Sequence, residues 1–403
     1  MPLLGTSSAP NVINSARRRR TRSRYDVAFY VPWLGPLLTR AVTSPAGGAE
    51  TQIFLLARAL ARRGSRVCLL VFDLPGTTIP SLLDGVAVCV RPPYRAHQRL
   101  GRIREALSLR RAVVDAHADV LVTRAAGPDV GLAGLSAKLS RRRFVYSSAN
   151  LSDFDFSRVS TKRHNQVLFR LGIRLADEIV VQTAEQARLC EERFGRSAVL
   201  IRSIAEPAAQ RDRYPEAFLW IGRLVWYKRP LEFIELARSL PEAKFWMVGV
   251  PDPYSEPGPE LMKTVERMAA TVTNLELLPP RPRRDLMNLV DRAVAVVNTA
   301  DFEGMPNIFL EGWARGVPAL ALTHDPDRVI EQHRLGAFAQ GSSERLVDLA
   351  RQLWEDRTGQ VDVAARCRAY ILEHHSPEVV SAQWQDALGI ASIASAAGGG
   401  LVP

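Results

Sequence analysis

The sequence predicts an α/β protein in which two doubly wound parallel sheets, one in each of two domains, face a common cleft. Short apolar segments alternate with helical patterns along most of the chain, which is typical of parallel strands covered by helices on both faces. The alternation pauses once, between about 203 and 215, where prolines and charges break the periodicity. A length of 403 residues with 47% hydrophobic residues suffices for two sizeable cores.

The first half of the chain begins with a predicted strand at 26–31. A long loop leads from it to Gly47 and Gly48, and the helix that follows has apolar residues at helical spacing until a glycine ends it. Further helices are expected around 101–117 and 161–176. The other strands of this half are expected at 67–72, 86–90, 119–122, 144–146 and 178–181.

The second half repeats the alternation of strand and helix. Its strand 293–298 leads to a helix that Pro306 begins and Gly316 ends, because proline suits the first helical position and glycine the position after the last. Strands that face each other across two such sheets predict a ligand site in the cleft between them. The other strands are expected at 217–222, 244–249, 274–278 and 317–322.

Two carboxylates eight positions apart, Glu303 and Glu311, form the most informative motif. Glu303 lies in the loop after strand 293–298, and Glu311 lies on the helix that follows. Ligands of open α/β sheets bind beyond the carboxyl ends of the strands, and the N–H groups of a helix start attract anions. The motif therefore suits sugar hydroxyls and a phosphate. The alternative is that Glu303 caps the helix and Glu311 is solvated.

A second motif favours the ligand interpretation. A short apolar strand is expected to end at Gly222, and Arg223 and Lys228 follow five residues apart. Glycine lets the backbone approach a ligand closely, arginine offers a planar fork to phosphate oxygens, and lysine adds a point charge. The two loops together predict a cationic clamp beside two carboxylates.

These motifs resemble the donor-binding motifs of glycosyltransferase family 4, whose members are retaining, nucleotide-sugar-dependent enzymes of the GT-B fold. The resemblance extends over most of residues 25–390. It implies a metal-independent hexosyltransferase that takes a sugar from a UDP- or GDP-type donor. The acceptor would be a glycan, a lipid-linked compound or a small molecule, in polysaccharide or glycoconjugate biosynthesis. The residues that carry it are Gly222-Arg223-Leu224, Lys228, Glu303-Gly304-Met305-Pro306-Asn307, Glu311 and Gly316-Val317-Pro318.

The resemblance implies a catalytic role for Arg223, Lys228 and Glu303. The two cations would stabilise the negative charge that develops on the leaving β-phosphate. Glu303 would orient the donor sugar, and Glu311 would hold the ribose hydroxyls. The donor-binding residues implied are Gly47, Gly48, Gly222, Arg223, Lys228, Glu303, Gly304, Met305, Pro306, Asn307 and Glu311.

One segment departs from the family pattern. Members often carry a histidine after the strand that corresponds to 144–146, beside the transferred sugar. Residues 147–153 contain none. Asn150 and Asp153 are expected either to provide polar contacts beside the transferred sugar or to cap the loop.

The resemblance also assigns roles to the parts of the chain. Residues 25–203 would form the acceptor-side Rossmann-like domain, and residues 204–375 the donor-binding Rossmann-like domain. A helix at 376–390 would cross back toward the first domain. The basic tail 1–24 and the low-complexity end 391–403 are expected to be disordered.

The net charge of +11 owes much to arginines 17–20, 22 and 24, in a tail without acidic residues. A solvated extension is the favoured interpretation, and attraction to an anionic membrane surface is the alternative. Nucleic acid is disfavoured as a partner, because residues 16–24 contain no aromatic side chain on which bases could stack.

No cofactor or metal is expected. The four cysteines and seven histidines have no metal-ligand spacing, and the donor region has no Asp-x-Asp motif. The cysteines are typical of a reduced, cytoplasmic protein. The sequence has no secretory signal and no apolar stretch of about twenty residues, so we expect a cytoplasmic protein, with peripheral attachment at the inner face of a membrane as the extension of this hypothesis.

Two alternatives to a transferase remain on the same fold. One is a catalytically silent protein that binds nucleotide sugars, and the other is an epimerase or a phosphorylase. A dinucleotide oxidoreductase is disfavoured, because no Gly-x-Gly-x-x-Gly fingerprint follows the first strand.

Overall fold

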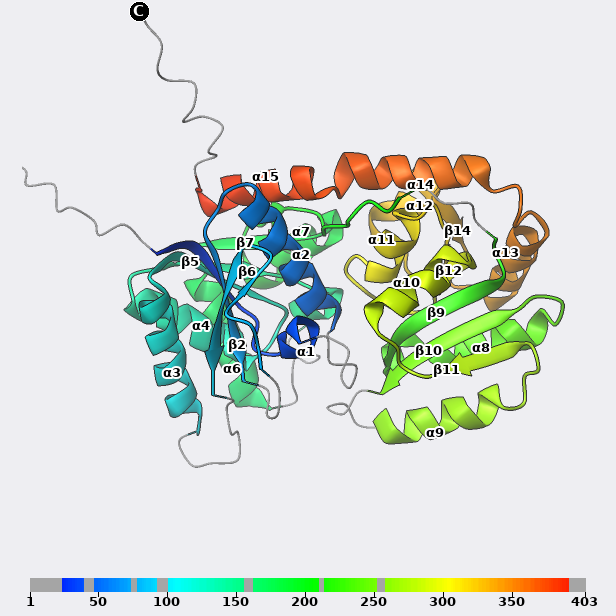
Figure 1. Ribbon diagram of the computed structural model, residues 1–403. Coiled ribbons are helices and arrows are strands. Elements are labelled where there is room, and N and C mark those ends of the chain that lie inside the picture. Colours follow the sequence, from blue (N-terminus) through cyan, green and yellow to red (C-terminus); the bar gives the residue numbers. More distant parts are fainter. Residues whose placement is uncertain are drawn as a thin grey trace, which may run out of the picture.

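The computed structural model describes residues 24–39, 47–73, 78–92, 101–155, 162–209, 214–251 and 258–390. Two α/β domains lie side by side, and each is built on one parallel sheet (Figure 1). The expected tails 1–24 and 391–403 lie outside the described residues, apart from Arg24.

The first sheet has the strand order β3-β4-β2-β1-β5-β6-β7-β8, and only the β3–β4 pair is antiparallel. Its middle strands are continuously apolar and buried, as β2 illustrates with every residue buried. The order reverses at β1, which places a switch point beside β5. The strands are β1 Tyr25–Tyr30, β2 Val67–Phe72, β3 Leu82–Leu83, β4 Val86–Arg91, β5 Ala118–Arg124, β6 Arg143–Ser147, β7 Glu178–Val181 and β8 Val199–Leu200.

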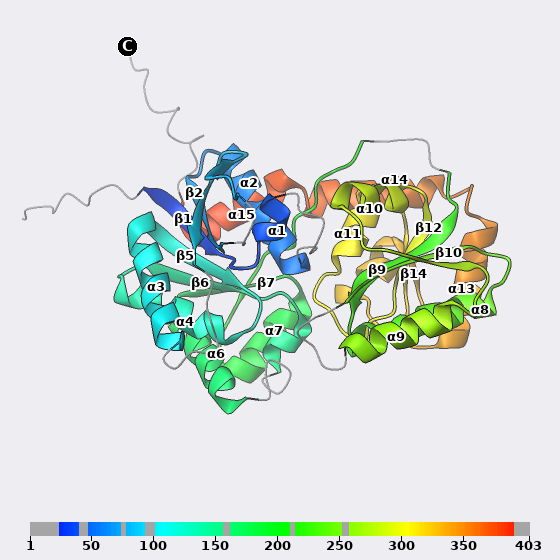
Figure 2. The same ribbon diagram turned by 60° about the horizontal axis from the view of Figure 1, so that its bottom comes forward.

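Helices cover both faces of this sheet (Figure 2). Helices α3, α4, α6 and α7 share one core, and α2 shares the other with the C-terminal helix α15. Helices α4 and α6 approach closely because a Cβ at Gly131 would stand 2.1 Å from the Leu168 carbonyl oxygen. The helices are α1 Gly35–Leu38, α2 Gly48–Arg62, α3 Gly101–Ala116, α4 Pro128–Leu139, η1 Leu151–Phe154, α6 Arg163–Leu175 and α7 Ala184–Phe194.

The second sheet is parallel throughout, in the order β11-β10-β9-β12-β13-β14. Its strands are β9 Ala217–Leu224, β10 Phe245–Pro251, β11 Leu275–Leu278, β12 Ala293–Asn298, β13 Ala319–Ala321 and β14 Gly336–Phe338. Its helices are η2 Trp226–Lys228, α8 Pro230–Ser239, α9 Gly258–Ala269, α10 Arg283–Asp291, α11 Asn307–Trp313, η3 Pro326–Arg328, α12 Val329–His333 and α13 Ser343–Glu355.

The chain crosses between the domains twice, at the linker near 203–209 and at the joint between α14 (Val361–His374) and α15 (Pro377–Leu388). Figure 1 shows α14 over the second domain and α15 over the first. The two crossings are bonded to each other: His375 Nδ1 donates to the Ser203 carbonyl at 2.6 Å, and Ala205 N donates to the His375 carbonyl at 2.8 Å. The linker and the closing helices therefore form one joint.

The buried imidazole at this joint predicts a loss of stability in mild acid. Burial, helped by Arg202 and His374, lowers the pKa of His375 to about 3, against the bond to Ser203. At a pH between about 3 and 6.5, the His375 imidazole is protonated in the unfolded chain and neutral in the folded chain. Stability is therefore lost as the pH falls below 6.5, by about 2 kcal/mol at pH 5.

Unfolding measured at pH 7 and pH 5 checks this prediction. His375→Asn should be less stable at pH 7 and should remove about 2 kcal/mol of the difference between the two pH values. His117→Asn at an exposed loop position is the matched control and should leave the difference unchanged. An equal pH dependence in His375→Asn and the parent would contradict the account.

Two of the boundaries that differ from the expected ones lie at the predicted ligand motifs. Strand β9 continues to Leu224, because it pairs with β10 from Phe218 to Leu224, so Gly222 does not end the strand and Arg223 lies inside it. Helix α11 begins at Asn307 with Pro306 as its cap, since Pro306 has an extended conformation. The short strands β3, β8 and β14 were not predicted, because two or three residues carry too little pattern.

Candidate functional site

Two loops meet at the carboxyl edge of the second sheet, because β9 and β12 are neighbours. One loop holds η2, and the other comprises residues 299–306. Thr299 Oγ1 donates to the Lys228 carbonyl at 2.7 Å and lies 3.1 Å from the indole nitrogen of Trp220. Asp301 N donates to the Tyr227 carbonyl at 2.8 Å. These bonds fix one loop against the other.

Lys228 and Glu303 form an ion pair across this junction, with Lys228 Nζ donating to Glu303 Oε1. Their side chains are 21% and 10% exposed. Partial removal from water strengthens the interaction of both charges with each other and with any charged ligand. The structure thus brings together two residues that the sequence placed in separate motifs.

Arg223 belongs to the same edge but differs in setting. Its side chain is exposed, and its Nη2 lies 3.5 Å from the Tyr227 hydroxyl. The Tyr227 ring stacks on Phe302 with centroids 4.8 Å apart. Gly222 lies over a tryptophan, since a Cβ there would meet the Trp220 ring at 3.0 Å. An arginine and an aromatic pair therefore flank the Lys228–Glu303 pair.

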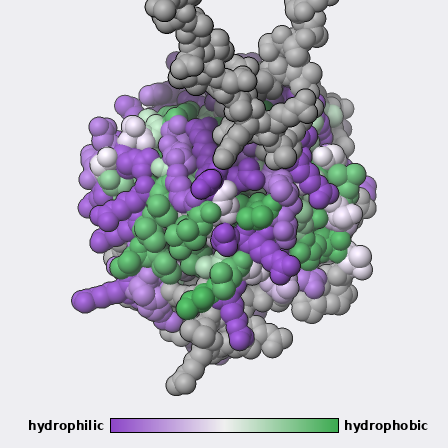
Figure 3. Space-filling model, turned by 90° about the vertical axis from the view of Figure 1, so that its left-hand side faces the viewer, coloured by the Kyte–Doolittle hydropathy of each residue, from purple (hydrophilic) through white to green (hydrophobic). Residues whose placement is uncertain are grey.

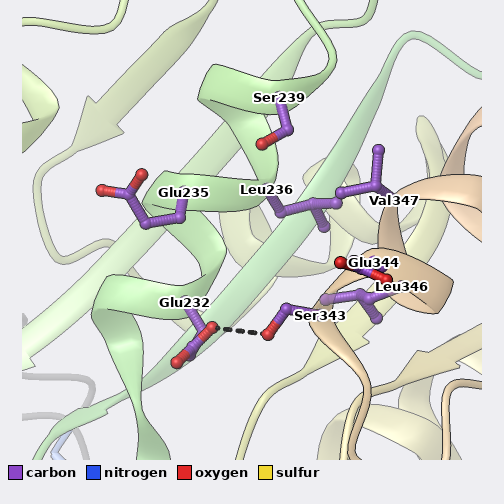
Figure 4. A pocket seen from close by; sticks show the side chains of 8 residues that line it. All are labelled: Glu232, Glu235, Leu236, Ser239, Ser343, Glu344, Leu346 and Val347. Carbon is purple, nitrogen blue, oxygen red and sulfur yellow. Dashed lines mark hydrogen bonds between the residues drawn. The ribbon is translucent and has the colours of Figure 1, made fainter.

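Arg229 holds the loop 299–306 through Asp301. This role was not predicted from the sequence. Arg229 adopts a left-handed conformation with φ of 45°. Its Nη1 lies 3.3 Å from Asp301 Oδ1 and its Nη2 lies 2.6 Å from Glu232 Oε1. Ser343 Oγ donates to Glu232 Oε2 at 3.2 Å, and both residues line a hollow between α8 and α13 (Figure 4). The residues that line this hollow include neither Lys228 nor Glu303.

Glu311 lies on α11 with its side chain 16% exposed. Its Oε1 accepts from Arg283 Nη1 at 2.6 Å, and Arg283 is the first residue of α10. The solvated alternative is therefore wrong for Glu311. Nothing in the sequence separates Arg283 from the other arginines, so this partner could not have been predicted.

Three residues of the Glu303 motif face protein. Met305 is 7% exposed and belongs to a core of the second domain. Asn307 Nδ2 donates to the Gly48 carbonyl at 3.0 Å, and its Oδ1 accepts from Gln52 Nε2 at 3.0 Å. Gly304 faces the first domain too, because a Cβ there would stand 2.6 Å from the Ala149 carbonyl oxygen. The motif therefore lies at the seam between the domains.

The glycines of the first domain serve the same seam. A Cβ at Gly48 would stand 2.6 Å from Asn307 Nδ2, and Gly47 is the cap before α2. Gln52, one turn later, donates to the Ile204 carbonyl and accepts from Ile204 N at 2.8 Å. The start of α2 therefore bonds both to the linker and to the second domain.

A second contact between the domains lies at α7. Asp327 Oδ2 accepts from Ala184 N at 2.9 Å and its Oδ1 accepts from Glu185 N at 3.3 Å, so a carboxylate of the second domain caps a helix of the first. Nearer the cleft, His324 Nε2 lies 3.1 Å from the Gly304 carbonyl, and its side chain is 8% exposed. Neither residue was predicted from the sequence.

The loop after β6 is fixed by its own side chains. Asp153 Oδ2 accepts from the Tyr146 hydroxyl at 3.0 Å and from Ala149 N at 2.7 Å. Burial raises the pKa of Asp153 against these bonds. Asn150 Oδ1 accepts from Ser152 N at 3.0 Å. Both side chains therefore cap the loop, in line with the second of the two roles expected for them.

The carboxyl end of β5 supplies a cation from the first domain. Arg124 Nη1 donates to Ser147 Oγ at 2.9 Å, while its Nε has no hydrogen-bond partner among the described residues. Burial lowers the pKa of Arg124 to about 10, against the attraction of Asp153 and Glu50. Position at a strand end is the only sequence signal that could have singled it out.

The described ranges contain no group of three or more His, Cys, Asp or Glu side chains that could hold a metal ion. In the same ranges, no helix combines the length and the apolar character needed to cross a bilayer. All four cysteines are free thiols.

Two family models match the chain, one on each domain. Residues 47–205 match the model described as a glycosyl transferase 4-like domain. Residues 215–356 match the model described as glycosyl transferases group 1. Gly47 and Gly48 open the first range, and both Lys228 and Glu303 lie within the second.

A curated protein of Xenopus tropicalis, glycosyltransferase 1 domain-containing protein 1, is 25% identical over 121 residues. The match covers 30% of this chain and 35% of that protein. The chain thus spans about a third of the length of the curated relative it matches.

Solved structures resemble most of the chain. Sucrose-phosphate synthase of Thermosynechococcus elongatus has a TM-score of 0.71 at 14% identity and covers 92% of this chain and 99% of its own. HepE of Anabaena, solved with UDP and glucose, has a TM-score of 0.70 at 14% identity. The match covers 91% of this chain and 100% of HepE. WaaG, a glycosyltransferase involved in lipopolysaccharide biosynthesis, has a TM-score of 0.63 at 17% identity. The match covers 90% of this chain and 99% of WaaG. These likenesses confirm the predicted fold class of two parallel-sheet α/β domains.

Proposed function

The chain belongs to the glycosyltransferases of GT-B fold that join a 4-like domain to a group 1 domain, and from this we propose that it moves a hexose from a nucleotide-sugar donor to an acceptor hydroxyl. The observation that carries the proposal is the Lys228–Glu303 ion pair. It lies beyond the carboxyl ends of two adjacent strands, where doubly wound sheets bind nucleotides.

Lys228 is the proposed electrostatic catalyst. A nucleoside diphosphate that leaves the sugar develops negative charge on its β-phosphate, and a fixed cation out of bulk water stabilises that charge most. Glu303 Oε1 holds the ammonium in place, and the other carboxylate oxygen is proposed to accept from a hydroxyl of the donor sugar. Arg223, exposed on the strand that leads to Lys228, is proposed as the second cation.

Glu311 is the proposed ribose contact. Its carboxylate has two oxygens, and Arg283 bonds Oε1, so Oε2 is the proposed acceptor for ribose hydroxyls while the arginine keeps the side chain in place. The HepE structure was solved with UDP and glucose. This supports a nucleotide-sugar donor of the UDP or GDP type. The involvement of WaaG in lipopolysaccharide biosynthesis supports a place for this chain in polysaccharide or glycoconjugate biosynthesis.

We propose retention at the anomeric carbon without a metal. The bond from C1 to the β-phosphate oxygen breaks, the acceptor oxygen bonds C1 from the same face, and the departing phosphate takes the acceptor proton. Lys228 and Arg223 supply the positive charge that a divalent cation gives other transferases. Turnover should be unchanged in a chelator. Its loss in the chelator and recovery on adding Mg²⁺ or Mn²⁺ would contradict metal independence.

A panel of nucleotide sugars tests the function. Thermal shift finds the donor that binds, and mass spectrometry of the products identifies the reaction. Transfer or slow hydrolysis of one nucleotide sugar supports the proposal. Binding without turnover on any glycan, lipid-linked or small-molecule acceptor would favour a silent binding protein, and an isomerised nucleotide sugar would identify an epimerase. A phosphorylase would instead release a sugar phosphate when phosphate is added.

The arginines of residues 17–24 are proposed to attach a cytoplasmic protein to the inner face of a membrane. Deleting residues 1–24 should lower binding to anionic vesicles and leave turnover on a soluble acceptor intact, because clustered arginines each contribute about 1 kcal/mol near such a surface. Vesicle sedimentation measures the first and a product assay the second. Raised salt should mimic the deletion. Equal vesicle binding by both proteins would leave the tail a solvated extension.

A further inference from the structure

Large apolar side chains are exposed together on three helices of the first domain. Helix α4 packs against α3 on one side and α6 on the other, so the three form one layer. Figure 3 shows hydrophobic side chains gathered on this end of the molecule among hydrophilic ones. We name the set the apolar face. It consists of Ile103, Leu107, Val114, Leu135, Leu139, Val167 and Leu171.

The spacing shows that these side chains form stripes. On α3, Leu107 lies four residues after Ile103 and Val114 seven after Leu107, which keeps all three on one helical face. Leu135 and Leu139 on α4, and Val167 and Leu171 on α6, are also four apart. Leu107 and Val167 are 59% and 62% exposed. The other faces of these helices already fill a core, so the stripes do not serve the folding of the domain.

The charges around the apolar face are mainly positive. Helix α6 carries Arg163, Arg170 and Arg174 and has no acidic residue between its ends. On α3, Arg110 and Arg111 are exposed, and Arg111 lies 3.9 Å from the one exposed carboxylate of the helix, Asp115. Glu105 of α3 offers no opposing charge at the surface, because it is 4% exposed and bonded within the domain. A partner of this face must therefore be both apolar and negatively charged.

We propose that the apolar face docks on the surface of an anionic lipid bilayer. Side chains such as Leu107 and Val167 would enter the boundary between headgroups and acyl chains, and the arginines beside them would contact lipid phosphates. A bilayer accepts apolar side chains from three neighbouring helices at once, and its charge complements theirs. This inference rests on the described residues of α3, α4 and α6, so it depends on neither sugar transfer nor the arginine tail.

Vesicle sedimentation of the full chain tests the proposal. The variant Leu107→Ser with Val167→Ser removes apolar surface and leaves the charge unchanged. It should bind vesicles that contain phosphatidylglycerol at least about tenfold more weakly than the parent. The matched control is Val361→Ser with Leu372→Ser, since these residues are 72% and 56% exposed on α14. The control should bind like the parent.

A second variant separates charge from apolar contact. Arg163→Gln with Arg174→Gln should weaken binding at low salt and flatten its salt dependence. All variants should keep the parental melting temperature, because the changed side chains are at the surface. Equal vesicle binding by parent and Leu107→Ser with Val167→Ser would overturn the proposal. A parent that forms dimers but binds no vesicles, with the serine variant monomeric, would also overturn it and assign the face to contact between copies.

Discussion

Lys228→Ala is expected to lower turnover, because the activation free energy should rise by about 2 to 4 kcal/mol, the scale for one lost electrostatic contact. Two effects act together. The cation proposed for the leaving phosphate is gone, and the Glu303 carboxylate, whose side chain is 10% exposed, is left as a negative charge beside that phosphate. Donor binding should weaken as well. Steady-state kinetics with the donor found in the panel gives kcat/KM, and calorimetry gives the affinity for the free nucleoside diphosphate.

Lys244→Ala is the matched control for this change. Lys244 is exposed and precedes β10, at the opposite end of the sheet, so its loss should leave kinetics at the parental level. The fold of Lys228→Ala should survive, which a melting curve checks. The double variant Lys228→Ala with Glu303→Gln restores the charge balance, so it should recover stability but not turnover. Unchanged turnover in Lys228→Ala would remove Lys228 from the mechanism.

The two glutamates are expected to fail differently when each loses its charge. Glu303→Gln should lower kcat more than it weakens binding of the free nucleoside diphosphate, because Glu303 bonds Lys228 and is proposed to orient the donor sugar. Glu311→Gln should weaken binding of the sugar-free nucleotide, since hydrogen bonds to a charged group contribute about 1.5 to 3 kcal/mol. Calorimetry with the sugar-free nucleotide measures one effect, and kcat on a saturating donor measures the other.

Arg283→Gln is the control that the structure adds, because Arg283 bonds Glu311. If Arg283 holds the Glu311 side chain in place for the ribose contact, Arg283→Gln should weaken nucleotide binding in the same direction as Glu311→Gln, but less. If Glu303→Gln and Glu311→Gln both bind the nucleotide and turn over like the parent, the two glutamates are a structural feature of the loop and helix. The central interpretation of the motif would then be wrong.

The sequence was sufficient for the fold because buried parallel strands such as β2 and β12 are continuous apolar runs between helical patterns. It was also sufficient to bring Lys228 and Glu303 to one edge, since each follows the end of a strand. It could not order the strands, and only the adjacency of β9 and β12 turns two motifs into an ion pair.

Partners that lie far apart in the chain were beyond the sequence. Arg283 as the partner of Glu311, and Gly48 as the partner of Asn307, depend on how helices and domains pack. The end of β9 was misplaced at Gly222 because glycine is typical of strand ends. Pairing with β10 instead carries the strand on to Leu224.

The bonds of Gln52 have a consequence for how substrates enter. Gln52 holds the linker by two bonds, to Ile204 N and to the Ile204 carbonyl, and among the described residues of the second domain it bonds Asn307. If the domains open, we expect the contacts of Asn307 and Asp327 to separate while Gln52 stays bonded to the linker. Water can replace those few polar bonds at about 0.5 to 1.5 kcal/mol each. Opening of this seam to the proposed donor would therefore leave both cores unchanged.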